Sequence, residues 1–466
     1  MEGIDRFGEL RVVEGANWEE EIGAATEVLQ HAVNRAPAVS FDAIPGFERG
    51  YRVLVNGVGS RKRIAYTLGL DVDASLQELI QQWRRRNDEF TPVAPRVVTD
   101  GPVMENVHTG NDVNVLEFPT PRWHDADGGR YIGTGSMDIT RDPETGTVNL
   151  GTYRVMVHNE KQVGFYISPG KHGRIHREKW FARNEPCPVA VVVGEDPLLY
   201  LASCTEVPYG TSEYDWAGGM RGEPADVIIG PVTGLPIPAR AEIVLEGFAY
   251  PNTRLLEGPF GEWTGYYASA SREEPVLDVK AIYHRNNPII FGSPPNKPPD
   301  EQAYYRAFMR SAHLRADLEK AGVPDVTGVW CHAVGGSRLL LAVSIQQRYP
   351  GHARQAGHVA AMCHAGAYLG RYVIVVDDDI DVTDLEDVVW AMCTRSDPAE
   401  SIDIIKRAWS GPLDPRIHPD HKGFNSRAII DATRPYEWRD RFPKVNAPAP
   451  EARRQALEKW GYLVDG

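Results

Sequence analysis

Apolar residues along the first hundred positions follow two periods in turn, one typical of helices and one typical of strands. An apolar stripe within 22–29 predicts a helix that Asn17 caps, with Glu20 three residues further on as in a capping box. The runs at 38–41 and 51–55 are short and contain Val next to aromatic residues, which favours strands. This part of the chain therefore alternates α and β elements.

A second helix is predicted where Ser75 and Glu78 form another capping-box pattern at the start of the apolar stripe 76–83. Several prolines follow soon after this stripe, and proline is a strong signal that a regular element has ended. We therefore expect an N-terminal α/β domain at 1–102.

The middle of the chain has a different pattern, because short apolar runs alternate there with Gly, Pro and Asn. One hairpin is expected around Asn159-Glu160. Many short strands at this spacing are typical of a β-barrel or a sandwich, so we expect a β-rich domain at 103–300. Strands are predicted at 147–158, 162–167, 189–194, 241–249, 276–283 and 289–292.

The last third returns to an α/β pattern, and we expect a C-terminal domain at 301–466. Its final helix is amphipathic, with Leu457 and Trp460 among its apolar residues. Such a helix either docks on a neighbouring subunit or packs on its own chain. Strands are predicted at 328–331, 339–345 and 371–376, and helices at 350–369, 384–392 and 450–461.

The composition is that of an ordinary globular protein, with 42% hydrophobic and 24% charged residues. Its net charge of −14 argues against binding to nucleic acid or to an anionic membrane, because both need basic surfaces. The first residues lack the apolar core of a signal peptide, and no apolar run reaches the roughly 20 residues that span a bilayer. The five cysteines are scattered without a CxxC pair, so we expect reduced thiols in the cytoplasm.

Two carboxylates flank a Gly-Pro-Phe-Gly loop, Glu257 at its start and Glu262 at its end. The glycines and the proline fix the backbone, so the loop itself holds the two acids. The aromatic residues Phe260 and Trp263 lower the local dielectric constant, which can raise a carboxyl pKa into the range useful for proton transfer. From the spacing alone, an exposed turn and an active site fit this segment equally well.

A second group of candidates lies in the middle third. Asn149 and Arg154 are five residues apart in one predicted strand, which puts them on opposite faces unless the strand bulges at Gly151. His172 and Glu213 lie in predicted loops, where an isolated histidine or glutamate is more often simply solvent-exposed. Taken together, an amide, an imidazole and a carboxylate suit Mn²⁺ or Mg²⁺, with water or phosphate oxygen completing the coordination.

The acidic run 377–381 follows a predicted buried strand but does not fit a calcium loop. Val382 and Val388 occupy the positions that need Gly and Glu, so a turn that caps the next helix explains the run better. The chain also has no GxGxxG motif opening a βαβ unit and no GxxxxGK[ST] run. Their absence argues against a Rossmann dehydrogenase and a P-loop kinase.

A series of motifs in a fixed order distinguishes the chain more sharply than any single one. The motifs are Asn149-x4-Arg154, Lys171-His172, Ser203-Cys204-Thr205 leading to Glu213, Glu257 to Glu262, the strand that ends in 377–381, and Ser426 to Thr433. With them the chain resembles, over nearly all of its length, the UbiD-like family of reversible decarboxylases, which use prenylated FMN. Each motif alone is weak, but their order makes the resemblance specific.

The resemblance implies roles for individual residues. Arg154, Glu257 and Glu262 match the family's catalytic network, in which Arg154 would orient the leaving carboxylate and Glu262 would protonate the carbon that loses CO₂. Prenylated FMN would be bound next to two ions. The matching positions are Asn149, His172 and Glu213 for Mn²⁺ (or Mg²⁺); Ser203, Thr205 and the backbone of Ala202 for K⁺ (or Na⁺); and Asn149, Arg154, Lys171, His172, Ser203, Cys204, Glu213 and Arg427 for the cofactor.

The resemblance also implies the fold, the reaction and the partners. The fold is α/β plus β: an N-terminal α/β unit, a central split β-barrel like that of flavin reductases, which holds the cofactor, and a C-terminal α/β oligomerisation domain. The reaction is reversible, non-oxidative decarboxylation of an aromatic, heteroaromatic or α,β-unsaturated carboxylic acid through a covalent prenylated-FMN adduct. A flavin prenyltransferase would supply the cofactor, and the chain would form a homodimer or a hexamer.

Three positions depart from relatives in this resemblance. Glu262 stands where some members carry Asp. Arg427 stands where several relatives have Lys, and Lys171 precedes the metal histidine where cinnamate-type relatives have Gln. Because Lys171 should lie near the substrate, the sequence favours an aromatic or heteroaromatic acid over a cinnamate-like one.

Two other functional classes stay open from the residues themselves. A divalent-metal hydrolase could use Asn149, His172 and Glu213 with a bound water. A flavin reductase or flavin-binding protein could share the barrel, and it would not need Glu257 and Glu262.

Overall fold

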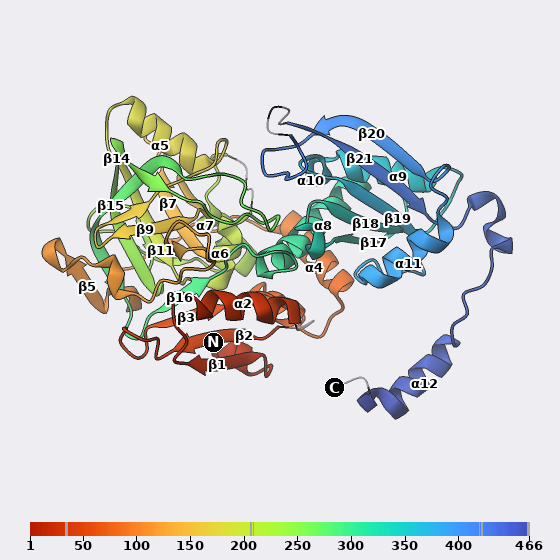
Figure 1. Cartoon of the computed structure of the whole chain (residues 1–466), viewed down its shortest axis with the longest axis horizontal. Helices are drawn as coiled ribbons and strands as arrows, with labels where there is room; N and C mark the ends of the chain where they lie inside the picture. The colour runs from red at the N-terminus through yellow and green to blue at the C-terminus, as the bar shows by residue number, and fades with distance from the viewer. Residues whose placement is uncertain (33–35, 206, 208, 419, 421–422, 464–466) are drawn as a thin grey trace.

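A computed structural model gives the fold and describes every residue except 33–35, 206, 208, 419, 421–422 and 464–466. A curled β domain and a C-terminal α/β domain lie side by side, and a smaller N-terminal α/β layer packs against the β domain (Figure 1). The three parts follow the change of pattern along the sequence.

The N-terminal layer is built on a four-stranded sheet with the order β1-β2-β3-β16. Its edge strand β16 comes from beyond the β domain and pairs in parallel with β3. The predicted strand at 289–292 therefore belongs to this sheet and not to the barrel. The strands are β1 (Leu10–Glu14), β2 (Ala38–Asp42), β3 (Arg52–Val55) and β16 (Ile289–Gly292), and the helices are α1 (Glu2–Asp5), α2 (Glu21–Ala32), α3 (Arg61–Thr67) and α4 (Leu76–Glu89).

Helix caps decide where α4 and α2 begin. The Ser75 side chain accepts a hydrogen bond from Glu78 N, and the Glu78 carboxylate accepts one from Ser75 N, so the predicted capping box is confirmed. At α2 the Asn17 side chain accepts a backbone N–H as predicted, but the reciprocal carboxylate is Glu21 and not Glu20. The difference arises because a turn precedes the first helical residue.

The β domain is a curled nine-stranded sheet whose strands pair antiparallel in the order β6-β9-β10-β15-β14-β11-β7-β8, with β5 added to β15. Three helices and a small sheet, β13-β12-β4, accompany it. The large sheet consists of β5 (Asn106–Thr109), β6 (Arg130–Gly133), β7 (Ser136–Arg141), β8 (Val148–Gly151), β9 (Val155–Asn159), β10 (Gln162–Gly164), β11 (Cys187–Val193), β14 (Ile243–Glu257) and β15 (Arg272–His284). The other elements are β4 (Arg96–Val97), β12 (Asp226–Ile229), β13 (Pro236–Pro238), α5 (His172–Ala182), α6 (Pro197–Ser203) and α7 (Glu213–Arg221).

The strand predicted at 147–158 is divided into β8 and β9. β8 pairs with β7, whereas β9 pairs with β6 and β10, so the two halves have different neighbours. The break comes after Gly151, where the sequence required a bulge if Asn149 and Arg154 were to serve one site. The two residues are therefore released from the strict alternation of a single strand.

The C-terminal domain is a five-stranded mixed sheet with the order β17-β18-β19-β21-β20, in which both edge strands run antiparallel to their neighbours. The predicted helix at 350–369 is interrupted at Cys363 and forms α9 and α10. No described helix combines the length and the apolar character needed to span a bilayer. The elements are α8 (Glu301–Lys320), β17 (Val326–Cys331), β18 (Leu340–Ile345), α9 (His352–Met362), α10 (His364–Ala367), β19 (Tyr372–Asp377), α11 (Leu385–Arg395), β20 (Ile402–Trp409) and β21 (Phe424–Ala432).

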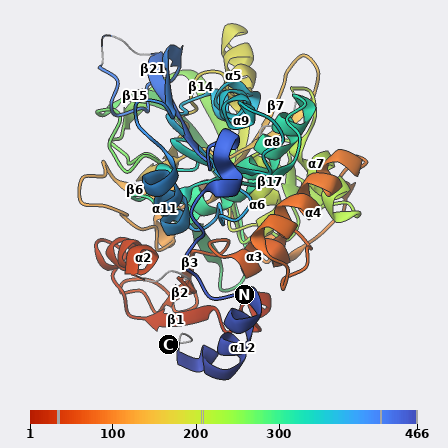
Figure 2. The same cartoon turned by 90° about the vertical axis from the view of Figure 1, so that its right-hand side faces the viewer.

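The last helix, α12 (Pro450–Trp460), stands apart from the C-terminal sheet at the end of an extended segment (Figures 1 and 2). Its apolar side chains are exposed, with Leu457 at 55% and Trp460 at 49%. Within the described part of the chain, the apolar face of this helix is therefore uncovered. Of the two arrangements that the sequence left open, packing on its own chain is not the one observed.

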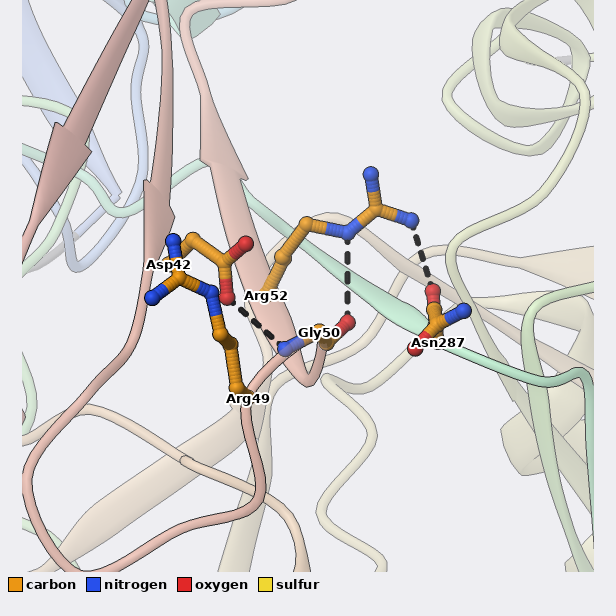
Figure 3. A pocket seen from close by; sticks show the side chains of 5 residues that line it. All are labelled: Asp42, Arg49, Gly50, Arg52 and Asn287. Carbon is orange, nitrogen blue, oxygen red and sulfur yellow. Dashed lines mark hydrogen bonds between the residues drawn. The ribbon is translucent and has the colours of Figure 1, made fainter.

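A shallow pocket of about 390 Å³ lies where the N-terminal layer meets the turn after β15 (Figure 3). Gly50 N donates to the Asp42 carboxylate, and the Arg52 guanidinium donates to the carbonyls of Gly50 and Asn287. The bond from Arg52 to Asn287 links the start of β3 to the turn after β15, and the other two hold the loop before β3 in place. The lining consists of Asp42, Arg49, Gly50, Arg52 and Asn287, and it contains none of the site residues predicted from the sequence.

Candidate active site

Arg154 and Glu257 form a two-point ion pair at the end of β14. Nε of Arg154 donates to Oε1 of Glu257 over 2.9 Å, and Nη2 donates to Oε2 over 2.7 Å. The Glu257 side chain is 1% exposed and that of Arg154 11%. The planar guanidinium matches the carboxylate, and such a pair stays strong where water is excluded.

Glu262 completes this cluster, which we call the Arg154 group (Arg154, Glu257 and Glu262). Its Oε1 lies 3.4 Å from Nη1 of Arg154, so one guanidinium contacts both acids. The loop between the acids turns at Gly258, whose φ of 84° favours glycine. Burial raises the pKa of Glu262, in the direction that the apolar loop predicts, while Arg154 opposes the shift. A carboxyl group with a raised pKa retains its proton to higher pH, as a general acid must.

Aromatic side chains enclose the Arg154 guanidinium. The ring centre of Tyr166 lies 4.6 Å from it and that of Phe260 lies 5.8 Å from it. Tyr131 stacks on Phe260 with 4.0 Å between ring centres and donates its hydroxyl hydrogen to Oε1 of Glu257 over 3.1 Å. Glu257 is thus held by three donors, whereas Glu262 has the longer contact to Arg154, so Glu262 is the less constrained acid.

Asn149, His172 and Glu213, which we call the Asn149 group, come from three elements that meet beside the divided strand. Asn149 is on β8, and His172 and Glu213 are the first residues of α5 and α7. Oε2 of Glu213 accepts a hydrogen bond over 2.7 Å from the backbone N–H that follows Asn149. The Tyr153 hydroxyl interacts with the Asn149 side chain and accepts the backbone N–H that follows His172. The structure therefore brings the three predicted ligands into one neighbourhood. Tyr153, which contacts two of them, is the residue directly before Arg154 in the chain.

Glu213 is a buried carboxylate that a cation would complement. It is 2% exposed, and burial raises its pKa to about 7. Backbone N–H groups, including that of Leu150, oppose this rise of the pKa. Among the described residues, no cationic side chain opposes it. With the amide of Asn149 and the imidazole of His172, it forms a donor set that fits Mn²⁺ or Mg²⁺.

The C-terminal end of α6 faces the break between β8 and β9. Oγ of Ser203 lies 2.6 Å from Oγ1 of Thr152, and Sγ of Cys204 lies 3.2 Å from the same atom. The carbonyl of Ala202 accepts the N–H of Thr205. Because the last carbonyls of a helix carry partial negative charge, this end of α6 fits a monovalent cation.

The structure places Lys171 next to the Asn149 group and Arg427 in the C-terminal domain. Lys171 is the exposed N-cap residue of α5, directly before His172. Arg427 lies on β21, is 1% exposed, and donates to the carbonyls of Trp409 and Gly366 over 2.8 and 3.3 Å. These contacts give Arg427 a role in holding its own domain together, and a contact with a cofactor phosphate stays a prediction for it.

Arg306, on α8, is a second cation near the Arg154 group that sequence reasoning missed. It opposes the effect of burial on the pKa of Glu262. The ring of Trp263, next to Glu262, occupies the space where a side chain of Gly336 would start. The acidic loop therefore faces the C-terminal domain. An arginine within a long amphipathic helix carries no sequence signal that would have linked it to a loop in another domain.

Three domain models of one family match the chain in order. The N-terminal domain of 3-octaprenyl-4-hydroxybenzoate carboxy-lyase (UbiD) matches residues 2–83, the Rift-related domain matches 96–298, and the C-terminal domain matches 303–432. Together they account for most of the chain.

Curated relatives match over almost their whole length. Phenolic acid decarboxylase of Sedimentibacter hydroxybenzoicus is 35% identical over 448 residues, which cover 93% of this chain and 90% of that protein. Pyrrole-2-carboxylic acid decarboxylase of Pseudomonas aeruginosa is 31% identical over 460 residues, which cover 94% and 92%.

Solved structures share the fold. Vanillic acid decarboxylase of Sedimentibacter hydroxybenzoicus in its open form matches with a TM-score of 0.87 at 33% identity and covers 100% of this chain and 98% of that chain. An evolved dimeric form of the UbiD-class enzyme HmfF from Pelotomaculum thermopropionicum, in complex with prenylated FMN, matches with a TM-score of 0.81 at 26% identity, covering 96% of both chains. The predicted three-part fold with a central split barrel is confirmed. The chain belongs to the 3-octaprenyl-4-hydroxybenzoate carboxy-lyase (UbiD) family.

Proposed function

We propose that this protein is a prenylated-FMN-dependent carboxy-lyase that decarboxylates small aromatic or heteroaromatic carboxylic acids, with α,β-unsaturated acids as a further class. The observation that carries the proposal is the buried group in which Arg154 bridges Glu257 and Glu262. Relatives named for phenolic acids and for pyrrole-2-carboxylic acid, and a family member solved with prenylated FMN, support the substrate class and the cofactor.

The Arg154 group supplies the acid–base chemistry in this proposal. Nη1 of Arg154, which has the longer contact to Glu262, is the donor best placed to take the substrate carboxylate. Glu262, whose pKa burial raises, delivers its proton to the carbon that loses CO₂. The rings of Tyr166 and Phe260 keep water from the charged groups. Prenylated FMN, when bound, supplies the electron sink without which loss of CO₂ from an sp² carbon is too costly.

The ions and the remaining contacts serve to anchor the anionic cofactor. A divalent and a monovalent cation would offset phosphate charge in a protein whose own net charge is −14. We assign Asn149, His172 and Glu213 to Mn²⁺ or Mg²⁺, the Ala202 carbonyl, Ser203 and Thr205 to K⁺ or Na⁺, and Lys171, Cys204 and Arg427 to further cofactor contacts. A flavin prenyltransferase in the same cytoplasm would supply the cofactor.

Protein co-produced with a flavin prenyltransferase tests the proposal. The extracted cofactor should have the visible spectrum and the mass of prenylated FMN, and a panel of aromatic and heteroaromatic acids should include one that releases CO₂. A colourless protein that hydrolyses its substrate with a metal alone would identify the hydrolase alternative. Ordinary FMN together with consumption of NAD(P)H would identify the flavin reductase alternative.

Retention of Mn²⁺ should fall as the pH falls through about 7. Glu213 has to lose its proton to bind the ion, and burial raises its pKa to about 7 in the ion-free protein, so protons compete with the metal below that pH. Equilibrium dialysis of the flavin-free protein against Mn²⁺ across this range measures the effect. Glu213→Gln should bind weakly throughout, and Glu223→Gln, at an exposed position near the other end of α7, should behave as the wild type. Tight retention well below the pKa of Glu213 would contradict the assignment.

We further propose domain boundaries at 102/103 and 300/301, with self-association through the C-terminal domain as a homodimer or hexamer. The support is a group of exposed apolar side chains on its sheet. The patch contains Tyr372 (47% exposed), Ile404 (57%), Trp409 (62%) and Phe424 (52%). Its position on the edge strand β20 and its neighbours leaves it open to a second copy.

Trp409→Glu should shift the protein toward the monomer, because a charge in the centre of a desolvated contact is costly. Sedimentation velocity across a range of protein concentrations measures the change. Ile229→Glu, which replaces an apolar residue 47% exposed in the β domain, is the matched control and should leave the assembly intact. Identical sedimentation of the two variants would argue that the patch is not the contact.

A further inference from the structure

A second cluster of metal-ligating side chains lies away from the candidate active site, where the β domain meets the N-terminal layer. His108 is on β5, Glu117 ends the short helix η3 (Val115–Glu117), and His284 ends β15. One ligand atom from each lies within 4.8 Å of the others. Nδ1 of His108 is 3.1 Å from Oε1 of Glu117, and the two imidazole rings are 5.1 Å apart between centres.

His284 holds its hydrogen in the arrangement of a metal ligand. It is 2% exposed, and its Nδ1 lies 2.8 Å from the carbonyl of Arg285, which can only accept, so Nδ1 carries the hydrogen. Nε2 therefore presents a lone pair, and this buried nitrogen has no hydrogen-bond partner among the described residues. A histidine fixed through one nitrogen by a backbone carbonyl is the usual form at metal centres.

The charge around the cluster favours a cation. The carboxylates of Glu48 and Glu105 act on the His284 ring and favour positive charge there, whereas the neighbouring His108 opposes it. The side chains of His108 and Glu117 are 29% and 22% exposed, so an ion can reach the cluster from solvent and keep water on its open side. Without an ion, the buried lone pair of His284 stays unsatisfied, which is unfavourable.

We propose that His108, Glu117 and His284 bind a divalent transition-metal ion, for which Zn²⁺ is the best match. Two imidazole nitrogens and one carboxylate oxygen, with water at a remaining position, are an established Zn²⁺ ligand set, and imidazole ligands favour Zn²⁺ over Mg²⁺ or Ca²⁺. Zinc–ligand distances of about 2.0–2.1 Å place tetrahedral ligands roughly 3.3 Å apart. The pair His108 and Glu117, at 3.1 Å, already has this spacing.

The ion would fasten the segment 106–117 to the end of β15. β5 already pairs with β15, and Nδ2 of Asn106 donates to the carbonyl of His284 over 3.1 Å. The rings of Tyr51, from the N-terminal layer, and Phe118 pack on the His284 ring with 5.8 and 5.4 Å between centres. The site is therefore structural, lies within the β domain where the N-terminal layer packs on it, and does not depend on the proposed function.

Zinc uptake by chelator-stripped full-length protein tests the proposal. After dialysis against low-micromolar Zn²⁺, the wild type should retain about one equivalent per chain more than His284→Gln, measured by plasma mass spectrometry. The same difference should appear in a His172→Ala background, in which the predicted manganese site is already disabled. His358→Gln, on the exposed side of α9 and paired with Asp403, is the matched control and should retain the equivalent.

Equal zinc content in the wild type and a folded His284→Gln variant would overturn the proposal. If that variant fails to fold by circular dichroism, His108→Asn and Glu117→Gln, at partly exposed positions, decide the question in the same assay. Zn²⁺ should also raise the thermal midpoint of the wild type and of His358→Gln but not of the three site variants. A rise of the same size in all of them would also count against the site.

Discussion

Glu262→Gln is expected to reduce CO₂ release by at least about a hundredfold while bound prenylated FMN stays at the wild-type level. The amide keeps the size of the side chain and its proximity to Nη1 of Arg154, but it has no acidic proton to give. The cofactor contacts that we assign lie on other residues, so binding should not change. Single-turnover CO₂ release and the flavin-to-protein ratio of the purified variant measure the two effects separately.

Turnover should also depend on pH differently in the wild type and in Glu262→Gln. Burial raises the pKa of Glu262, and the acid acts only when protonated, so wild-type turnover should decline as the pH rises through that pKa. The residual activity of Glu262→Gln should lack this decline. Glu273→Gln, at an exposed position on β15, is the matched control and should keep both the rate and the profile. Normal turnover by Glu262→Gln would remove Glu262 from the role of proton donor.

The sequence predicted those features of the fold that depend on residues close together in the chain. The capping box of Ser75 and Glu78 fixes the start of α4, because the cap and the first turn are neighbours. The split of the strand after Gly151 was also foreseeable, since Asn149 and Arg154 could not otherwise serve one site. What decides such features lies within a turn or two of the chain.

Pairings between strands far apart in the sequence could not be predicted. Strand β16 was expected in the barrel, yet it pairs in parallel with β3, more than two hundred residues earlier. A short apolar strand carries no information about which sheet edge it will join, because several edges offer the same backbone hydrogen bonds. The order of strands therefore had to come from the three-dimensional packing.

In the candidate site, too, residues in one short segment could be predicted, whereas their partners from distant parts of the chain could not. The loop from Glu257 to Glu262 could be singled out because both acids lie in one short segment. Tyr131, whose hydroxyl contacts Glu257, is 126 positions away from it, and Arg306 belongs to another domain. An isolated tyrosine or arginine has many ordinary roles, so only the fold identifies these partners.

Arg154→Met is expected to abolish turnover and to destabilise the flavin-free protein by about 3–5 kcal/mol. The Glu257 side chain is 1% exposed, and without the guanidinium its charge would remain buried with the hydroxyl of Tyr131 as a neutral donor. The double variant Arg154→Met/Glu257→Gln removes that charge, so it should recover most of the stability. It should not recover activity, because nothing replaces the donor for the substrate carboxylate. Urea unfolding and CO₂ release measure the two outcomes.

Arg272→Met is the matched control for this prediction. Arg272 also stacks on Tyr166, 4.4 Å from its ring centre, but in its ion pair with Glu274 the two side chains are 42% and 12% exposed, against 11% and 1% for Arg154 and Glu257. A pair whose arginine is open to solvent contributes about 0–1 kcal/mol, so this variant should remain more stable than Arg154→Met. The contrast isolates the burial of Glu257 as the cause, because both arginines lose the same aromatic contact. Equal stability of Arg154→Met and Arg272→Met would show that the ion pair is no buried anchor, and the proposed function would lose the observation on which it rests.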